Sequence, residues 1–233
     1  MINEMIKKSD YAPIKQVSDN EYFLMWGCTP VMENVYQRDE DGNIVLNEDK
    51  KPIVVSQKET EYCMACNETF MLPTNGDNIV SVVNQGNAMG YGVPSMEEWA
   101  EWAKVFVPVH LQIQFLKERL KEEIRRYDKS EEVEDFSIGG VHMWLDSNKR
   151  TKVWENLMTA QQKGEENVTL RDGGLAFPMT VAMGWQLYYA VLDYARATWD
   201  VTEIHLAEAG QLTTIEEILA YDYKQGYPEK LAF

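Results

Sequence analysis

The chain has 233 residues, of which 45% are hydrophobic and 11% aromatic, a composition typical of packed globular proteins. This composition excludes a disordered tail protein, a collagen and a continuous coiled-coil rod. The 38 acidic and 22 basic residues give a net charge of −16, which argues against a nucleic-acid partner because phosphate neutralisation needs clustered Lys and Arg.

The N-terminal residues 1–15 contain no apolar stretch as long as a signal peptide, and no stretch of the chain is long enough to span a bilayer. We therefore expect synthesis in a cytoplasm and no membrane partner. Residues 1–94 hold 14 acids and 7 bases, and residues 95–233 hold 24 acids and 15 bases. The charges are −7 and −9, so neither half is a basic arm.

Residues 20–71 show the pattern of β structure. An aromatic-rich stretch precedes Pro30, and the sequence Asp41-Gly42-Asn43 between two apolar stretches predicts a hairpin turn. We expect three to five mostly antiparallel strands over residues 20–71, within a β domain of residues 1–83. One face of these strands is polar, and the other face needs a covering element.

Residues 73–94 carry four of the 14 glycines and two prolines around the short apolar run from Ile79 to Val83. Clusters of Gly and Pro are typical of connections between domains. The sequence therefore predicts a Gly-rich linker over residues 84–94 that separates two domains.

A helical segment is predicted over residues 95–127. Ser95 and Glu98 have the spacing of a capping box, and Pro108 is expected to kink the helix or divide it in two near residue 107. An apolar heptad stripe follows the segment, and it predicts a partner helix or an intramolecular packing face. The candidate interface residues on this stripe are Trp99, Trp102, Phe106, Val109, Ile113, Leu116 and Leu120.

The remainder, residues 128–233, repeats one pattern twice: a hairpin with a Gly-Gly turn and then a helix. The hairpins fall at 136–145 and 169–178, and we expect them to pair into one sheet. The first helix is predicted from Asp146 to near Gly164. Residues 179–199 are apolar on nearly all sides, which predicts a central buried helix. The aromatic C-terminal tail is expected to pack back on this domain.

Cys63 and Cys66 have metal-ligand spacing, and Cys28 is the third cysteine. A structural zinc site normally needs four ligands, and residues three apart in a strand point to opposite faces. We therefore expect no metal and no cofactor. The histidines His110, His142 and His205 are isolated, and the acidic runs are typical of solvated surface, so no catalytic residues are predicted.

Scattered residues in the C-terminal half form a recognisable pattern. They are Arg-Arg-Tyr-Asp-Lys-Ser (125–130), Met-Trp-Leu-Asp (143–146) followed by Arg150, Leu-Asp-Tyr-Ala-Arg (192–196), Asp-Val-Thr (200–202) and Gly-Tyr-Pro-Glu-Lys-Leu (226–231). Over residues 110–233 the chain resembles an uncharacterised domain family of tailed bacteriophages and prophages, encoded near tail or tail-fibre genes. The family supplies no active site.

The expected architecture is α+β: an antiparallel β domain, a long helix with a heptad stripe, and a C-terminal domain of two hairpins and helices. The resemblance implies a non-enzymatic virion protein of the tail or fibre region. It would bind other tail or fibre proteins and form a homo-oligomer. One alternative is a tail-fibre assembly chaperone absent from the mature virion. Another is a glycan-acting enzyme, which would need two carboxylates with abnormal pKa values in a cleft.

Overall fold

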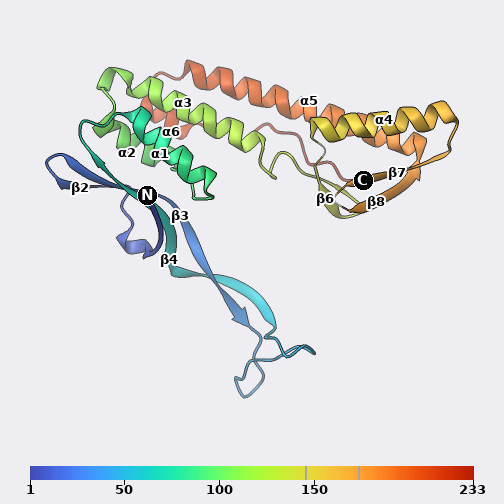
Figure 1. The fold of residues 1–233 in the computed structure, drawn as a ribbon, viewed down its shortest axis with the longest axis horizontal. Helices are drawn as coiled ribbons and strands as arrows, with labels where there is room; N and C mark the ends of the chain where they lie inside the picture. Colours follow the sequence, from blue (N-terminus) through green and yellow to red (C-terminus); the bar gives the residue numbers. More distant parts are fainter. Residues whose placement is uncertain (145, 173) are drawn as a thin grey trace. The chain divides into compact units, whose positions relative to one another are not determined.

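The computed structural model describes residues 1–144, 146–172 and 174–233, and it has the predicted α+β fold (Figure 1). The chain forms two compact units, Met1–Arg119 and Leu120–Phe233. The division between them falls inside one helix, α3 (Val109–Asp128). The units are described separately below.

A four-stranded antiparallel sheet forms the base of the first unit. Its strands are β1 (Ile2–Lys7), β2 (Ile14–Ser18), β3 (Glu21–Tyr36) and β4 (Val54–Met71), in the order β1-β4-β3-β2. A short 3₁₀ turn, η1 (Lys8–Asp10), follows β1. The predicted β region of residues 20–71 is two long strands, while β1 and β2 come from residues that the sequence did not predict as strands.

Helices α1 (Gly76–Ala88) and α2 (Met96–Phe106) follow the sheet. The capping box predicted at Ser95 and Glu98 is present and starts α2. Pro108 separates α2 from α3, so the predicted segment 95–127 is two helices that meet at residues 107–108. This outcome follows from proline's missing N–H, which removes a helical hydrogen bond.

Aromatic side chains join α2 to the sheet. The ring of Trp102 meets that of Trp26 edge to face at 5.7 Å, and Phe106 meets Tyr22 at 5.4 Å in the same manner. The Trp102 indole N–H also donates a 2.7 Å hydrogen bond to the Pro13 carbonyl. These contacts place the core of the first unit between α2 and one face of the sheet.

The predicted Gly-rich linker over residues 84–94 is wrong, because residues 84–88 are the end of α1. Asn75 caps this helix by accepting a hydrogen bond from the Asn78 N–H. Gly92 serves close packing, since a Cβ on it would lie 2.7 Å from the Cα of Gly27. The compact units also divide at residues 119–120, well after the predicted boundary.

The second unit contains two hairpins and three further helices. The hairpins are β5 (Phe136–Ile138) with β6 (Val141–Met143), and β7 (Asn167–Asp172) with β8 (Leu175–Thr180). The helices are α4 (Ser147–Lys163), α5 (Val181–Gln211) and α6 (Ile215–Ala220). The first turn has Gly139 and Gly140 at positive φ, as predicted. Leu145 and Gly173 of the predicted hairpins lie outside the described residues.

The two hairpins form separate two-stranded sheets, so the predicted single sheet is wrong. The C-terminal tail occupies the edge of β5, so this edge is not available to the second hairpin. Ser137 N–H donates to the Leu231 carbonyl at 3.0 Å, and Phe233 N–H donates to the Ser137 carbonyl at 2.9 Å. The tail therefore packs back on its unit as expected and takes the hydrogen-bonding edge.

Helix α5 is not the central buried helix that its composition predicts. Only one stripe of it is buried, which includes Leu187, Val191 and Tyr194, whereas Met183, Tyr189 and Trp199 are exposed. Farther along the stripe, His205 accepts or donates through both ring nitrogens, to the Tyr221 hydroxyl at 2.7 Å and the Gln225 carbonyl at 2.9 Å. His205 is thus a structural residue that holds the tail.

The buried carboxyl group of Glu98 makes the stability of the fold depend on pH. Its buried carboxylate accepts hydrogen bonds from the Tyr11 hydroxyl and from the Ser95 N–H. Burial raises the pKa of Glu98 from 4.5 to about 7, although the hydrogen bond from the Ser95 backbone opposes this shift. Because the folded pKa exceeds the unfolded one, this group stabilises the fold fully below pH 4.5, and that contribution is lost as pH rises through 7.

We expect the free energy of unfolding to fall by roughly 2 kcal/mol between pH 5 and pH 8 on account of this group. Glu98→Gln should remove most of that slope in urea titrations, because the amide does not ionise. Exposed Glu101→Gln is the matched control and should keep the wild-type slope. A Glu98→Gln variant with an unchanged slope would contradict the assignment.

Candidate functional site

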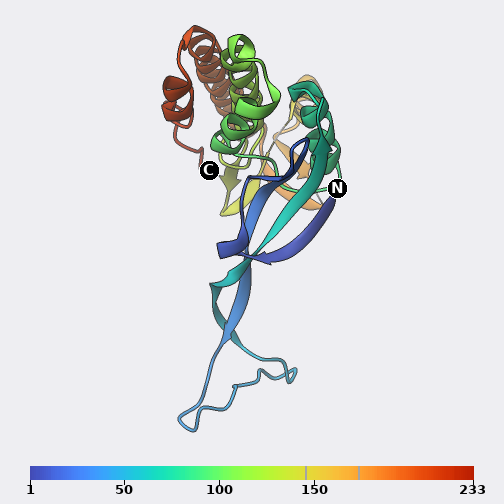
Figure 2. The ribbon, with the colours of Figure 1, turned by 90° about the vertical axis from the view of Figure 1, so that its left-hand side faces the viewer.

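Strands β3 and β4 continue beyond the four-stranded part of the sheet as a two-stranded ribbon. β1 pairs with β4 only over Tyr62–Asn67, and β2 pairs with β3 only over Glu21–Leu24. We call residues 29–61, which comprise this ribbon and the loop at its end, the arm. Figure 2 shows the arm extending away from the other strands of the first unit.

Cross-strand side-chain pairs and polar turns shape the arm. Glu33 and Lys58 form a salt bridge at 2.7 Å, and the amides of Asn34 and Gln57 are joined at 2.9 Å. At the predicted turn, the Asp39 carboxylate accepts hydrogen bonds from the backbone N–H groups of Asp41 and Asn43. These bonds hold the pKa of Asp39 below its ordinary value. The hairpin predicted around Gly42 is therefore present, at the far end of the arm.

The arm surface combines exposed apolar side chains with an acidic excess. Residues 29–61 hold 8 acids and 4 bases, a net charge of −4. The exposed apolar residues of the arm are Met32, Ile44, Leu46, Val54 and Val55. An unpaired strand edge beside apolar side chains is a template to which another chain can add a strand. Chemically, the arm is suited to binding a protein.

The structure does not bring the predicted interface residues of the heptad stripe together on an open seam. Trp99, Trp102 and Phe106 are buried in the first unit, and Leu116 and Leu120 of α3 are also buried. Val109 is 83% exposed and Ile113 is 36% exposed. The chain itself therefore covers five of the seven candidate interface residues, so these five do not form an open seam for a second chain.

The cysteines lie at the base of the arm. Cys63 and Cys66 are buried in β4, whereas Cys28 of β3 is partly exposed. Residues 62–67 pair with β1 without a break, so Cys63 and Cys66 point to opposite faces of the sheet. Among the described residues, no group of three or more His, Cys, Asp and Glu side chains has the geometry of a metal site.

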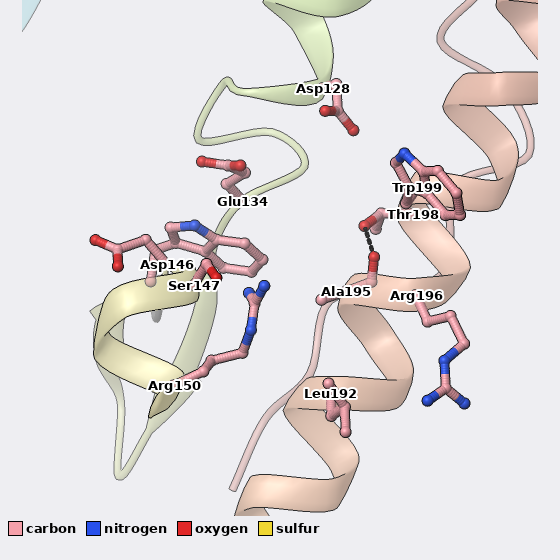
Figure 3. Close-up of a pocket in the computed structure, with 11 residues that line it drawn as sticks. Asp128, Glu134, Asp146, Ser147, Arg150, Leu192, Ala195, Arg196, Thr198 and Trp199 are labelled. Carbon is pink, nitrogen blue, oxygen red and sulfur yellow. Dashed lines mark hydrogen bonds between the residues drawn. The ribbon is translucent and has the colours of Figure 1, made fainter. Parts of the chain in front are cut away.

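A cavity of about 450 Å³ lies in the second unit, between the end of α3, the start of α4 and the middle of α5 (Figure 3). Arg150 points into the space between α4 and α5, whereas Arg196 points away from α4. The lining residues are Asp128, Glu134, Trp144, Asp146, Ser147, Arg150, Leu192, Ala195, Arg196, Thr198 and Trp199.

Glu134 and Asp146, two carboxylates that line this cavity, have pKa values shifted in opposite directions. Burial, followed by the negative charge of Asp128, raises the pKa of Glu134. Asp146 caps α4, and the hydrogen bond from the Lys149 N–H at 2.9 Å lowers its pKa. The guanidinium of Arg150 lies 5.9 Å from the centre of the Trp144 ring. Carboxylates of unequal pKa next to aromatic rings are an arrangement that can bind or protonate a polar ligand.

Sequence reasoning missed the cavity because its residues come from four separate segments with no common motif. Glu134 belongs to an acidic run whose pattern is typical of solvated surface, and Asp146 is predicted only as the start of a helix. The sole signal available was the residue pattern of the C-terminal half, which includes Asp128, Trp144, Asp146 and Arg150. That pattern identified the residues without suggesting that they line one cavity.

Comparison of the chain with protein-family models, with curated proteins and with solved structures finds no match. Within the part of the chain that the structure describes, none of the helices has the length and apolarity needed to cross a bilayer.

Substitutions of two stripe residues test which face of α3 is buried. Leu116 is fully buried and Ile113 lies on the surface of the same helix. Leu116→Ala should lower the free energy of unfolding by about 2–5 kcal/mol through cavity formation. Ile113→Ala should change it by less than about 1 kcal/mol. Urea denaturation of both variants measures this difference, and equal effects would show that α3 presents another face to the core.

Proposed function

We propose that this chain is a non-enzymatic structural protein of the tail or tail-fibre region of a bacteriophage particle, where the arm attaches it to a neighbouring protein. The observation that carries the proposal is the arm itself, a ribbon of two strands with open edges and exposed apolar side chains. The phage-type residue pattern of the C-terminal half gives the particle context. A homo-oligomer remains a further expectation, but one that cannot use the buried part of the stripe.

The stability of the arm favours a binding partner. A two-stranded hairpin is marginally stable alone in water, and a third strand or a packed surface stabilises it. In the first unit, β1 and β2 supply that support only at the base of β3 and β4. The distal arm therefore gains most from a partner that adds a strand or a groove to it.

Charge narrows the class of partner. The arm carries −4 and the whole chain −16, so two arms of the same charge repel one another. A neighbour with a basic strand edge or groove would gain both main-chain hydrogen bonds and charge complementarity. The partner proposed for the arm is thus a different protein of the particle with a basic docking surface.

A shortened arm tests this proposal. Thr60 Oγ1 donates to the Val31 carbonyl at 2.9 Å, so these residues face one another and an Asn-Gly turn can replace residues 32–59 between them. A milder truncation replaces only residues 38–52, because the Gln37 N–H donates to the Ile53 carbonyl at 2.9 Å and keeps the ribbon closed. Both variants should fold, since they lose mainly exposed residues.

Mass spectrometry of purified, nuclease-treated particles measures the outcome. We expect the wild-type chain at a fixed copy number beside tail proteins, the milder truncation reduced less than tenfold, and the shortened arm reduced at least tenfold. Incorporation of the shortened arm at the wild-type level would overturn the attachment role. A wild-type chain found only in infected-cell lysate, bound to a fibre protein, would replace the proposal by the assembly-chaperone alternative.

The cavity of the second unit supports a second candidate function, action on a host-surface saccharide. Glu134, with its raised pKa, would be the proton donor, and Asp146, with its lowered pKa, would stay ionised. The exposed ring of Trp199 would be a platform for a sugar. This pair of carboxylates in one cavity is the specific observation that favours an enzyme.

Release of reducing ends from host envelope polysaccharide tests the enzymatic candidate. If the cavity is catalytic, Glu134→Gln should lower the rate by about 10²–10⁴-fold, and the rate should fall as pH rises through the raised pKa of Glu134. Glu131→Gln, an exposed acid of the same run, is the control and should keep the wild-type rate. Equal activity of wild type and Glu134→Gln would exclude this role.

A further inference from the structure

The base of the arm brings two thiols close together on neighbouring strands. Between Trp26 and Thr29, β3 contains one residue more than β4 opposite it, which is a β-bulge with Gly27 at a φ of +68°. Cys28 lies in this bulge, and its side chain is hydrogen-bonded to that of Cys63 on β4. The bulge thus brings together two cysteines that are 35 positions apart in the sequence.

Cys63 interacts with the Cys28 side chain across the two strands. Burial is the main cause that raises the pKa of Cys63 to about 11, and the hydrogen bond with Cys28 raises it further. The bulge places Cys28 opposite this part of β4, so the two cysteines are neighbours on adjacent strands.

The third cysteine is excluded from this contact by strand geometry. Cys66 lies three residues beyond Cys63, on the opposite face of β4. It is also buried, whereas Cys28 is partly exposed and lines a surface hollow of about 340 Å³ with Gly27, Thr29 and Gly92. A reagent in solution therefore reaches Cys28 first.

We propose that Cys28 and Cys63 form an intramolecular disulfide that fixes the base of the arm when the chain meets a low-molecular-weight disulfide such as oxidised glutathione. The Cys28 thiolate attacks the reagent, forms a mixed disulfide and releases one glutathione thiolate. The Cys63 sulfur then gives up its proton, attacks the Cys28 sulfur and displaces the second glutathione. Two protein thiols are oxidised, one disulfide reagent is reduced to two thiols, and the two protons end on the released thiolates.

The disulfide would close a covalent loop over residues 28–63, which contains the whole arm. The strands of the ribbon would then stay joined at the base even where their ladder opens. This inference is independent of the arm's proposed attachment role, because it depends only on the thiol contact within one chain.

The test treats the folded, reduced chain with oxidised glutathione, removes the reagent and then unfolds the chain so that its buried thiols become accessible. The remaining thiols are blocked with an alkylating agent, and the peptides are mapped by mass spectrometry. We expect one alkylated cysteine, Cys66, and a Cys28–Cys63 linked peptide lighter by two hydrogen atoms. Cys66→Ala should give the same link, and Cys28→Ser should leave Cys63 alkylated. The rate should rise with pH above 7, because the second step needs the Cys63 thiolate.

The same oxidation carried out in urea should give a different disulfide link, because unfolding removes the strand geometry that separates Cys63 from Cys66. Once the chain is unfolded, Cys63 and Cys66 are the closest pair in sequence, so their link should replace the Cys28–Cys63 link. Three alkylated cysteines in the oxidised native chain would overturn the proposal, as would a Cys63–Cys66 link in the native state. A link between two chains as the main product would also overturn it.

Discussion

Trp102 holds helix α2 against the N-terminal sheet through two different interactions at once. Its ring packs edge to face on Trp26 of β3, and its indole N–H is bonded to the carbonyl of Pro13, just before β2. The ring also meets Trp99 within α2. Because a buried indole without a hydrogen-bond partner is unfavourable, the bond to Pro13 makes this packing specific as well as apolar.

The arm extends from the part of the sheet that Trp102 packs against. β3 enters the core at Leu24 and Trp26 and leaves it at the bulge formed by Gly27 and Cys28. The close approach of Gly27 and Gly92 leaves no room for a side chain at either position, so the backbone at the bulge is fixed from both sides. The ribbon beyond the bulge thus has a rigid base and an uncovered end, which is the arrangement that suits a binding arm.

The sequence predicts those parts of the fold that local chemistry determines. The capping box at Ser95 defines the start of α2, Pro108 divides the helices, Gly139 and Gly140 form a hairpin turn, and Asp146 starts α4. Each of these depends on residues within a few positions of one another, where hydrogen-bond and backbone rules apply directly.

The remaining features depend on contacts between distant residues. Gly76 starts α1 and is buried, and a Cβ there would lie 2.8 Å from the ring of Phe115, a close approach that no local pattern predicts. The tail takes the edge of β5, which no local pattern at Ser137 indicates. The heptad stripe marks an apolar face correctly, but the spacing of its residues does not say whether a second chain or the sheet of the same chain covers it.

Hydrogen–deuterium exchange of the free chain and of the chain in purified particles would test the attachment role of the arm most directly. In the free chain, we expect amides at 29–36 and 54–61 to exchange faster than those at 62–67, which β1 and β3 enclose. In the particle, the arm amides should become protected, with little change elsewhere in the first unit. Arm amides that exchange equally fast in both states, with new protection at another surface, would contradict the account.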